Sequence, residues 1–383
     1  MSAGDAVGTR VAGNAGGADS AESTDTIHPA SGGALPAGSL IGIVAPAGPT
    51  SPERLAQVAP MFEARGYRVR LYPSCSARHE ALPYLAGSDA QRVADLHAAL
   101  ADDEVAAILC LRGGYGCMRL LQAIDATLVR TQHKLLAGYS DITALLALWS
   151  REGAPALHAP MATSDIVLPE RSADRDAFFA LLRRGVHVGD VLRLAETPSP
   201  TPTPLPPQVQ SPSQTQTQTQ AAAAAAAPGA EDLASITVPG LAEGCLVGGN
   251  LSLLAALQGT PFAWPADAPT LLFIEDVGEE PYRIDRLLTQ LGLAGALEVA
   301  TGFVLGSFTQ QAYPLEVLRD RLLPLGKPVL AGWPAGHGVP NRPLPLGLRM
   351  RLDARAGTLT LLQGWGAPRR PKMRTRPEST ARL

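Results

Sequence analysis

The chain has 383 residues, of which 46% are hydrophobic and 17% charged, and its formal net charge is -3. This length is sufficient for two domains with sizeable cores, and the composition is typical of a folded globular protein. The weak negative charge excludes a protein that binds nucleic acid through a basic surface, and no segment has the roughly 18 consecutive apolar residues of a membrane span. The first residues lack the basic start and apolar stretch of a secretory signal, so we expect a cytoplasmic protein without a membrane partner.

The first 38 residues are rich in Gly, Ala and Ser and are predicted to form a disordered head, 1–38. The apolar run in "SLIGIVAPAGP" then predicts a buried strand that ends at Pro46. The next segment, "SPERLAQVAPMFEARGY", predicts a helix with Ser51 as N-cap, Pro52 at its first position and Gly66 at its end.

Strands and helices continue to alternate: a strand in "RVRLYP", a helix capped by Ser88, a strand in "VAAILCLRG", a helix in "CMRLLQAI" and a strand in "KLLAGY". This alternation predicts an α/β fold with a parallel sheet. We therefore expect a Rossmann-like, doubly wound N-terminal domain over residues 39–190, with a late helix around "DRDAFFALLRRG".

Residues 195–234 consist of a Pro-rich piece, a Gln-Thr alternation and a polyalanine run, which predicts a disordered insert or linker. A smaller mixed α/β C-terminal domain is expected over 235–365, with strands in "TLLFIED", "ATGFVLGSF" and "KPVLAG". Its helices are predicted in "YRIDRLLTQLGLAG" and "PLEVLRDRLLPLG", and a hairpin in "LRMRLDARAGTLTLL" completes it. The basic tail, 366–383, has no aromatic residues to stack on bases.

The four cysteines form no CxxC pair, which favours a reducing compartment, and neither a metal nor a cofactor is expected. Cys110 and Cys117 flank a glycine-rich loop, where small buried apolar side chains are the expected role.

The stretch "LLAGYSDITALLALW" places Ser140 where a predicted strand gives way to a helix. A hydroxyl at such a turn is either a helix cap, a role that Asp141 could also fill, or a nucleophile on a tight elbow. In the second case the backbone N–H of Asp141 could donate to an oxyanion.

A serine nucleophile needs a base, and two of the seven histidines lie in suitable segments. His337, in the Gly/Pro-rich loop "GWPAGHGVPNRPLPLG", is the favoured base, and His158 in "ALHAPM" is a pocket-lining or core residue. Glu275 is the first polar side chain after the buried run of "LLFIED" and is the expected acceptor that orients the imidazole.

Two further glycine loops follow predicted strands. In "LRGGYGCMRLL" the N–H groups of Gly113 or Gly114 could hold an oxyanion or a substrate carboxylate, because consecutive glycines allow a ligand to approach the backbone. In "VGGNLSLL" Asn250 either binds a peptide substrate or caps the following helix.

Together these segments resemble the LD-carboxypeptidase family of serine peptidases, related to muramoyltetrapeptide carboxypeptidase. The matching segments span Ile41 to about Leu362 and are "IGIVAPAGP", "LRGGYG", "AGYSDITALL", "LHAPM", "GGNLSLLAALQGTP", "LFIEDVGEEPYRIDRLL" and "GHGVPNRPLPLG". The departures are the head, the insert and "HAPM", where the family usually has glycine after the histidine.

The resemblance implies a Ser140–Glu275–His337 triad, an oxyanion hole near Gly114 and Asp141, an active site between the two domains, and a homodimer. It also implies that the substrate is a murein tetrapeptide, which loses D-alanine during peptidoglycan recycling. The alternatives are an immunity-type hydrolase of peptidyl-nucleotide antibiotics such as microcin C, and a non-catalytic binder of peptides or nucleotides.

Overall fold

The structure is a computed structural model, and it describes residues 33–194, 228–264 and 268–366. Most of the predicted head and insert, and nearly all of the basic tail, lie outside the described residues. The ends of two of these segments belong to the fold. Leu35 is buried and its N–H donates to the carbonyl of Leu182, while α7 (Ala230–Ile236) occupies the end of the predicted insert and buries Ile236.

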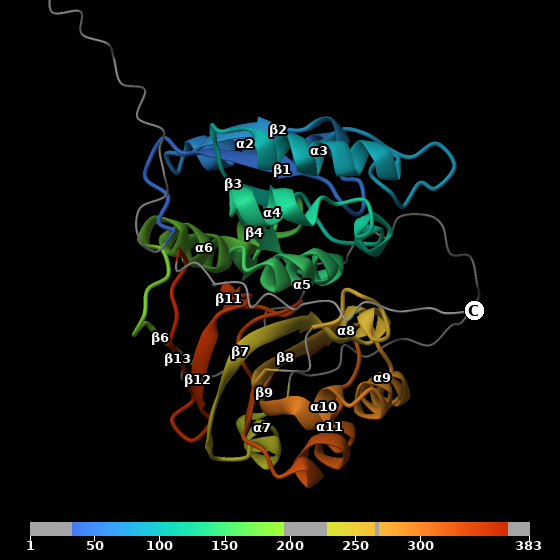
Figure 1. Cartoon of the computed structure of the whole chain (residues 1–383), viewed down its shortest axis with the longest axis vertical. Helices are drawn as coiled ribbons and strands as arrows, with labels where there is room; N and C mark the ends of the chain where they lie inside the picture. Colours follow the sequence, from blue (N-terminus) through green and yellow to red (C-terminus); the bar gives the residue numbers. More distant parts are fainter. Residues whose placement is uncertain (1–32, 195–227, 265–267, 367–383) are drawn as a thin grey trace, which may run out of the picture.

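A six-stranded sheet forms the upper half of the molecule in Figure 1. Its spatial order is β2 (Arg68–Leu71), β1 (Leu40–Val44), β3 (Val105–Cys110), β4 (Leu135–Gly138), β5 (Ala156–His158) and β11 (Leu344–Leu346). The first five strands are parallel, and only β11 is antiparallel to its neighbour. The chain direction across the sheet reverses between β1 and β3, so the crevice beyond their carboxyl ends is the place where α/β sheets bind ligands. The predicted doubly wound α/β fold is confirmed.

The helices of this half are α1 (Pro52–Leu55), α2 (Val58–Glu63), α3 (Asp89–Ala101), α4 (Ala126–Gln132), α5 (Thr143–Glu152) and α6 (Ser172–Arg184). The side chains of Ser51 and Ser88 cap α1 and α3, as predicted. The prediction of one continuous helix after Ser51 is wrong, because Pro60 lacks the N–H that would bond back to Ala56. The helix predicted in "CMRLLQAI" is only a short 3₁₀ turn, η2 (Cys117–Leu120), and Asp125 then caps α4.

A seven-stranded sheet forms the lower half (Figure 1). Its order is β10 (Val329–Ala331), β9 (Ala300–Thr309), β8 (Thr270–Val277), β7 (Leu241–Asn250), β12 (Arg349–Asp353), β13 (Thr358–Leu361) and β6 (Val191–Arg193). Strands β7 to β10 are parallel, and the predicted β12–β13 hairpin is antiparallel. The helices are α7, α8 (Leu251–Leu257), α9 (Pro281–Leu293), α10 (Ala296–Val299) and α11 (Leu315–Leu322).

The two sheets exchange strands, which the sequence did not predict. Strand β6 leaves the first half to pair with β13, and β11 leaves the second half to pair with β5. One apolar core accordingly includes side chains of both sheets, among them Leu109, Phe273 and Leu346.

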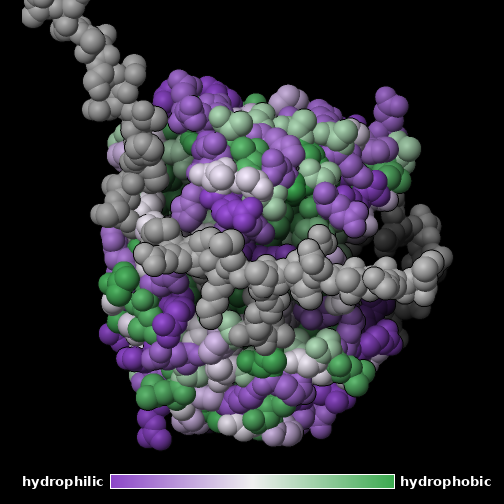
Figure 2. Space-filling view, in the orientation of Figure 1, coloured by the Kyte–Doolittle hydropathy of each residue, from purple (hydrophilic) through white to green (hydrophobic). Residues whose placement is uncertain are grey.

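The buried and exposed residues agree with the composition. Cys110 and Cys117 are fully buried, as expected for small apolar side chains. Hydrophilic and hydrophobic residues are interspersed over the face shown in Figure 2. None of the helices in the described part of the chain is long and apolar enough to cross a membrane.

Candidate active site

Ser140 lies in a strained turn between β4 and α5. It begins a short 3₁₀ helix, η3 (Ser140–Ile142). Its φ angle is +64°, which lies in the left-handed region that residues other than glycine rarely adopt. Its side chain caps no helix, and the Asp141 carboxylate accepts a hydrogen bond from the N–H of Cys117 at 2.8 Å instead of capping α5. The helix-cap alternative is therefore wrong for both residues. A strained strand-turn-helix with an uncommitted hydroxyl has the geometry of a nucleophile elbow.

The glycine loop after β3 packs directly against this turn. A Cβ atom at Gly113 would lie 2.7 Å from Cβ and 2.8 Å from Oγ of Ser140, so only glycine fits there. The same position is 3.6 Å from the backbone N of Asp141. Within the described chain, no hydrogen-bond acceptor faces the N–H groups of Gly114 and Asp141. These two groups therefore lack a protein acceptor in the described residues and belong to the two loops that meet where Gly113 contacts Ser140.

Glu275, on β8, is fully buried and bonded to His337. Its Oε2 atom lies 2.7 Å from Nδ1 and 3.1 Å from the backbone N of His337. The loop that carries His337 can approach this closely because Gly336 has no side chain: a Cβ there would lie 2.7 Å from Oε2 of Glu275. The imidazole thus donates through Nδ1 and keeps Nε2 available as a base.

The two groups of this pair shift each other's pKa. Burial alone would raise the pKa of Glu275, but the charge and hydrogen bond of His337 lower it overall. Burial alone would lower the pKa of His337, but the carboxylate of Glu275 raises it overall. The pair therefore stabilises the ionised carboxylate, and it stabilises the imidazolium that forms when Nε2 accepts a proton.

Tyr139 connects the serine turn to the histidine loop, and the sequence analysis did not select it. Its ring centroid lies 4.9 Å from that of His337, and its hydroxyl bonds Asp165, a buried carboxylate, at 3.2 Å. No hydrogen bond joins Ser140 to His337 in the described part of the chain. Such bonds are often long in free enzymes and tighten when substrate binds. The motif "GYSDI" contained Tyr139, but nothing in it indicated the ring contact.

His158 is a fully buried residue behind Glu275 and does not line an open pocket. Its ring lies between those of Tyr139 and Phe273, with centroid distances of 5.5 and 5.1 Å. Its Nε2 atom is 4.0 Å from Oε1 of Glu275, beyond hydrogen-bond range. Of the two roles expected for His158, pocket-lining or core residue, the structure therefore shows the second.

A clamp of three residues holds the histidine loop against the first half of the molecule. Arg171 donates to the carbonyl of Gly338 at 2.6 Å and to Asp174 at 3.0 Å. Asp174 accepts a hydrogen bond from the backbone N–H of Asn341 at 2.8 Å. The side-chain oxygen of Asn341 in turn accepts one from the backbone N–H of Gly336 at 3.0 Å. Sequence reasoning missed this clamp because Arg171 and Asp174 are 167 residues from the loop residues Gly338 and Asn341 that they contact.

Asn250 is buried and both of its side-chain groups are engaged. Its oxygen caps α8 through the N–H of Leu253, and its amide donates to Asp276 at 2.7 Å. Its backbone N–H donates to Thr143 of α5 at 3.0 Å, which joins the two halves near Ser140. Of the two roles expected for Asn250, substrate binding or helix capping, the structure shows helix capping.

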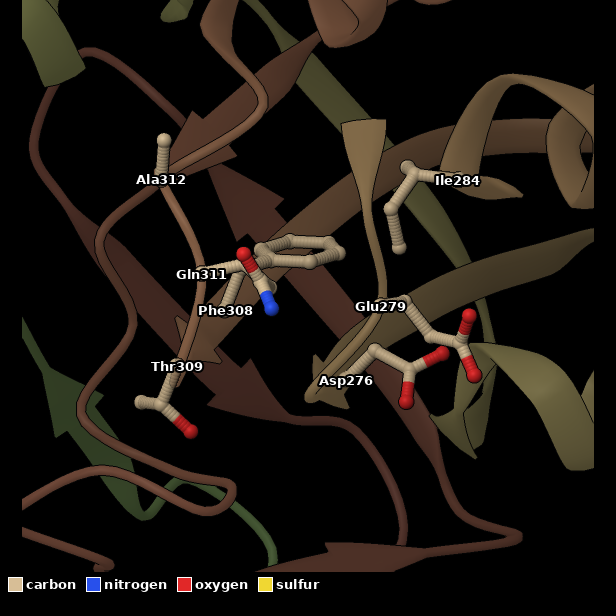
Figure 3. A pocket seen from close by; sticks show the side chains of 7 residues that line it. All are labelled: Asp276, Glu279, Ile284, Phe308, Thr309, Gln311 and Ala312. Atoms are coloured by element: carbon tan, nitrogen blue, oxygen red, sulfur yellow. The ribbon is translucent and has the colours of Figure 1, made fainter. Parts of the chain in front are cut away.

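Two pockets lie near these elements, and neither is lined by Ser140, Glu275 or His337. Asp276 and Glu279 face Thr309 and Gln311 across a small pocket at the ends of β8 and β9 (Figure 3). A larger, mainly apolar cavity of about 660 Å³ lies between α5 and β7.

Comparisons with known proteins agree with this fold. Residues 41–159 match the LD-carboxypeptidase N-terminal domain, and residues 243–352 match the LD-carboxypeptidase C-terminal domain. The probable murein peptide carboxypeptidase of Bacillus subtilis is 35% identical over 86% of this chain and 94% of its own. The murein tetrapeptide carboxypeptidase of Pseudomonas aeruginosa is 32% identical over 80% of this chain and 91% of its own.

Solved structures show the same architecture. The muramoyltetrapeptide carboxypeptidase from Oxalobacter formigenes is 28% identical, with a TM-score of 0.65, and the match covers 84% of this chain and 97% of that one. The microcin C7 self-immunity protein MccF has a TM-score of 0.71 over 87% of this chain and 98% of that one, but at 20% identity it shows the fold alone. The fold and the family matches together define a serine peptidase. More particularly, the chain belongs to the LD-carboxypeptidase family.

The close contact at Gly113 leads to a first prediction. Gly113→Ala should displace Ser140 and slow its labelling by a fluorophosphonate probe about 100-fold, because a displacement near 1 Å costs about that factor. Gly292→Ala is the matched control, since the nearest atom to its new Cβ would be 3.8 Å away. Labelling of Gly113→Ala at the wild-type rate would contradict the contact.

The Glu275–His337 pair leads to a second prediction. Glu275→Gln should lower the pKa of His337, because the carboxylate that raises it is removed while burial remains. NMR titration of the imidazole measures this shift directly, and an unchanged pKa would contradict the pairing.

The same pair should also make the stability of the folded protein depend on pH. Its contribution is complete above the ordinary carboxyl pKa of 4.5 and below the ordinary histidine pKa of 6.5. It is lost as the pH falls through the lowered pKa of Glu275, or rises through the raised pKa of His337. The wild-type advantage over Glu275→Gln in thermal unfolding should therefore be largest between these two values.

Proposed function

We propose that this protein is a serine carboxypeptidase that hydrolyses the L,D peptide bond of murein tetrapeptides and releases D-alanine. The observation that carries the proposal is the bond from Nδ1 of His337 to the buried Glu275, which keeps Nε2 free to act as a base. The ring contact between His337 and Tyr139, the neighbour of Ser140, supports the pairing of this base with the serine. The murein peptide substrate is supported by the names of the relatives and by the share of their length that the chain covers.

In the proposed mechanism Oγ of Ser140 attacks the carbonyl carbon, and its proton passes to Nε2 of His337. The backbone N–H groups of Gly114 and Asp141 stabilise the oxyanion. The imidazolium then gives its proton to the leaving nitrogen, so that D-alanine departs and an acyl-enzyme remains. Water attacks the ester with His337 again as base, which frees the shortened peptide and restores the serine. Glu275 stays ionised and stabilises each imidazolium.

Two further aspects of the setting belong to the proposal. A cytoplasmic location agrees with the unpaired, buried Cys75, Cys110 and Cys117. A homodimer rests on the family resemblance, and light scattering of the purified protein tests it.

A third prediction tests the nucleophile. Ser140→Ala should reduce the release of D-alanine from murein tetrapeptide by several orders of magnitude, because only binding and the oxyanion donors remain. The double variant with His337→Ala should lose about as much as either single variant, since the two residues act as a unit. Mass spectrometry of the released D-alanine measures both. A protein that binds the peptide but neither releases D-alanine nor reacts with a fluorophosphonate is the non-catalytic binder instead.

A second candidate function is suggested by an exposed aromatic pair beside the glycine loop. Tyr84 and Tyr115 are each about half exposed, and their ring centroids are 5.8 Å apart. Such a surface could stack on the base of a peptidyl-nucleotide.

A fourth prediction separates these two functions. Tyr115→Ala should leave hydrolysis of murein tetrapeptide nearly unchanged, and the wild type should cleave this peptide faster than a peptidyl-adenylate analogue. The reverse preference, lost in Tyr115→Ala, would favour the nucleotide substrate.

A further inference from the structure

Three arginines surround the loops next to Ser140, and the mechanism above uses none of them. Arg112 directly precedes Gly113, and it donates from Nε to the carbonyl of Gly113 and from Nη1 to that of Pro49, both at 3.2 Å. Arg78 donates to the next carbonyl, that of Thr50, at 3.3 Å. The third, Arg54, lies on α1, which begins two residues later.

This cluster lies at the switch point of the first sheet. Pro49 follows β1 and Arg112 follows β3, and these are the strands between which the chain direction reverses. The N–H of Gly48 donates to the carbonyl of Gly113 at 3.2 Å and ties the two loops together. A Cβ at Gly48 would lie 3.0 Å from the carbonyl oxygen of Gly113 and 3.6 Å from Nε of Arg112, so the two loops and this guanidinium lie in close contact. The crevice that the fold provides for a ligand is thus bordered by Arg112 on the side of the nucleophile.

The positive charge of the cluster is not balanced by protein groups. Arg119 and Arg171 are paired with aspartates, whereas no described carboxylate lies within ion-pair distance of Arg54, Arg78 or Arg112. The Arg112 residue as a whole is exposed, but partial desolvation lowers the pKa of its guanidinium, and the neighbouring charges of Arg54 and Arg78 lower it further. Cations gathered in this way repel one another unless an anion joins them.

We propose that Arg112, supported by Arg54 and Arg78, binds the free α-carboxylate of the substrate's C-terminal residue. The inference rests on the proposed function, and it names the side chain by which the enzyme would recognise the C-terminus of its substrate. When a single residue is removed, its carboxylate is attached to the carbon next to the scissile nitrogen. The group that recognises it must therefore lie next to the nucleophile, as Arg112 does through Gly113. A planar guanidinium can bind a carboxylate through two parallel hydrogen bonds.

The test compares two substrates that differ only at this carboxylate: murein tetrapeptide with a free C-terminus, and the same peptide with a C-terminal amide. The wild type should prefer the free acid. Arg112→Gln should lower kcat/KM for the acid about 10- to 100-fold, mainly by raising KM, and should lower kcat/KM for the amide by a clearly smaller factor. The amide nitrogen of glutamine takes about the place of Nε, so this variant keeps a donor for the carbonyl of Gly113. Arg112→Lys should recover part of the preference because it keeps the charge.

Two more variants control for folding. The Arg54 side chain makes no hydrogen bond in the described chain, so Arg54→Ala removes charge alone and should reduce the preference by a smaller factor. Arg321→Ala breaks a surface ion pair with Asp285 on a distant helix and should leave the preference intact.

The outcomes separate the inference from the function on which it rests. Release of D-alanine by the wild type, with an unchanged acid-to-amide ratio in Arg112→Gln, overturns the inference and leaves the proposed function standing. A wild type that releases neither D-alanine from the acid nor D-alaninamide from the amide overturns the proposed function, and with it the inference.

Discussion

The buried charge of Glu275 is the constraint on which the site depends. An ionised carboxylate with no solvent exposure is unfavourable by several kcal/mol unless it is paired and hydrogen-bonded. Among the described residues, the hydrogen bonds to this carboxylate come from the ring and the backbone of His337. The loop must therefore follow one path past β8, and glycine at position 336 permits that path. The orientation of the imidazole is a consequence of neutralising a charge in the core.

The oriented imidazole can act on Ser140 only if the two halves of the molecule are held together, because Ser140 belongs to the other half. The halves are joined close to the site at two places: Asn250 donates to Thr143, and Arg171 with Asp174 holds the loop of His337. Tyr139 packs against the imidazole between these two contacts. Contacts between the halves thus fix the relative positions of the residues in the candidate active site.

The sequence predicted most of the fold and the polar residues that follow buried strands, because both leave local patterns. Ser140 and Glu275 were selected in this way, and His337 was selected because it lies in a loop rich in glycine and proline. The choice between cap and ligand at Asn250 was open, since the same residue at the same position serves either role. Tyr139, Asp165 and the Arg171 clamp were missed because their roles arise only from contacts between distant segments. Arg112 stood inside a motif that was interpreted for its backbone alone.

The elements that differed from prediction have equally physical reasons. Pro60 interrupts a helix whose apolar pattern continues through it, and α4 begins at an Asp125 cap that lies outside any strong periodicity. Strands β6 and β11 have three residues each, too few for an alternating pattern to identify them or to indicate the sheet that they join.

The strand exchange has a consequence for the order in which the protein is completed on the ribosome. The first sheet can assemble as far as β5 soon after that strand emerges, but its last strand, β11, is translated almost 190 residues later. During this interval the N–H and carbonyl groups along one side of β5 have no partner, and such an open edge invites pairing with other nascent chains. Prompt synthesis, or a chaperone that shields this edge, would protect the unfinished polypeptide until its final residues arrive.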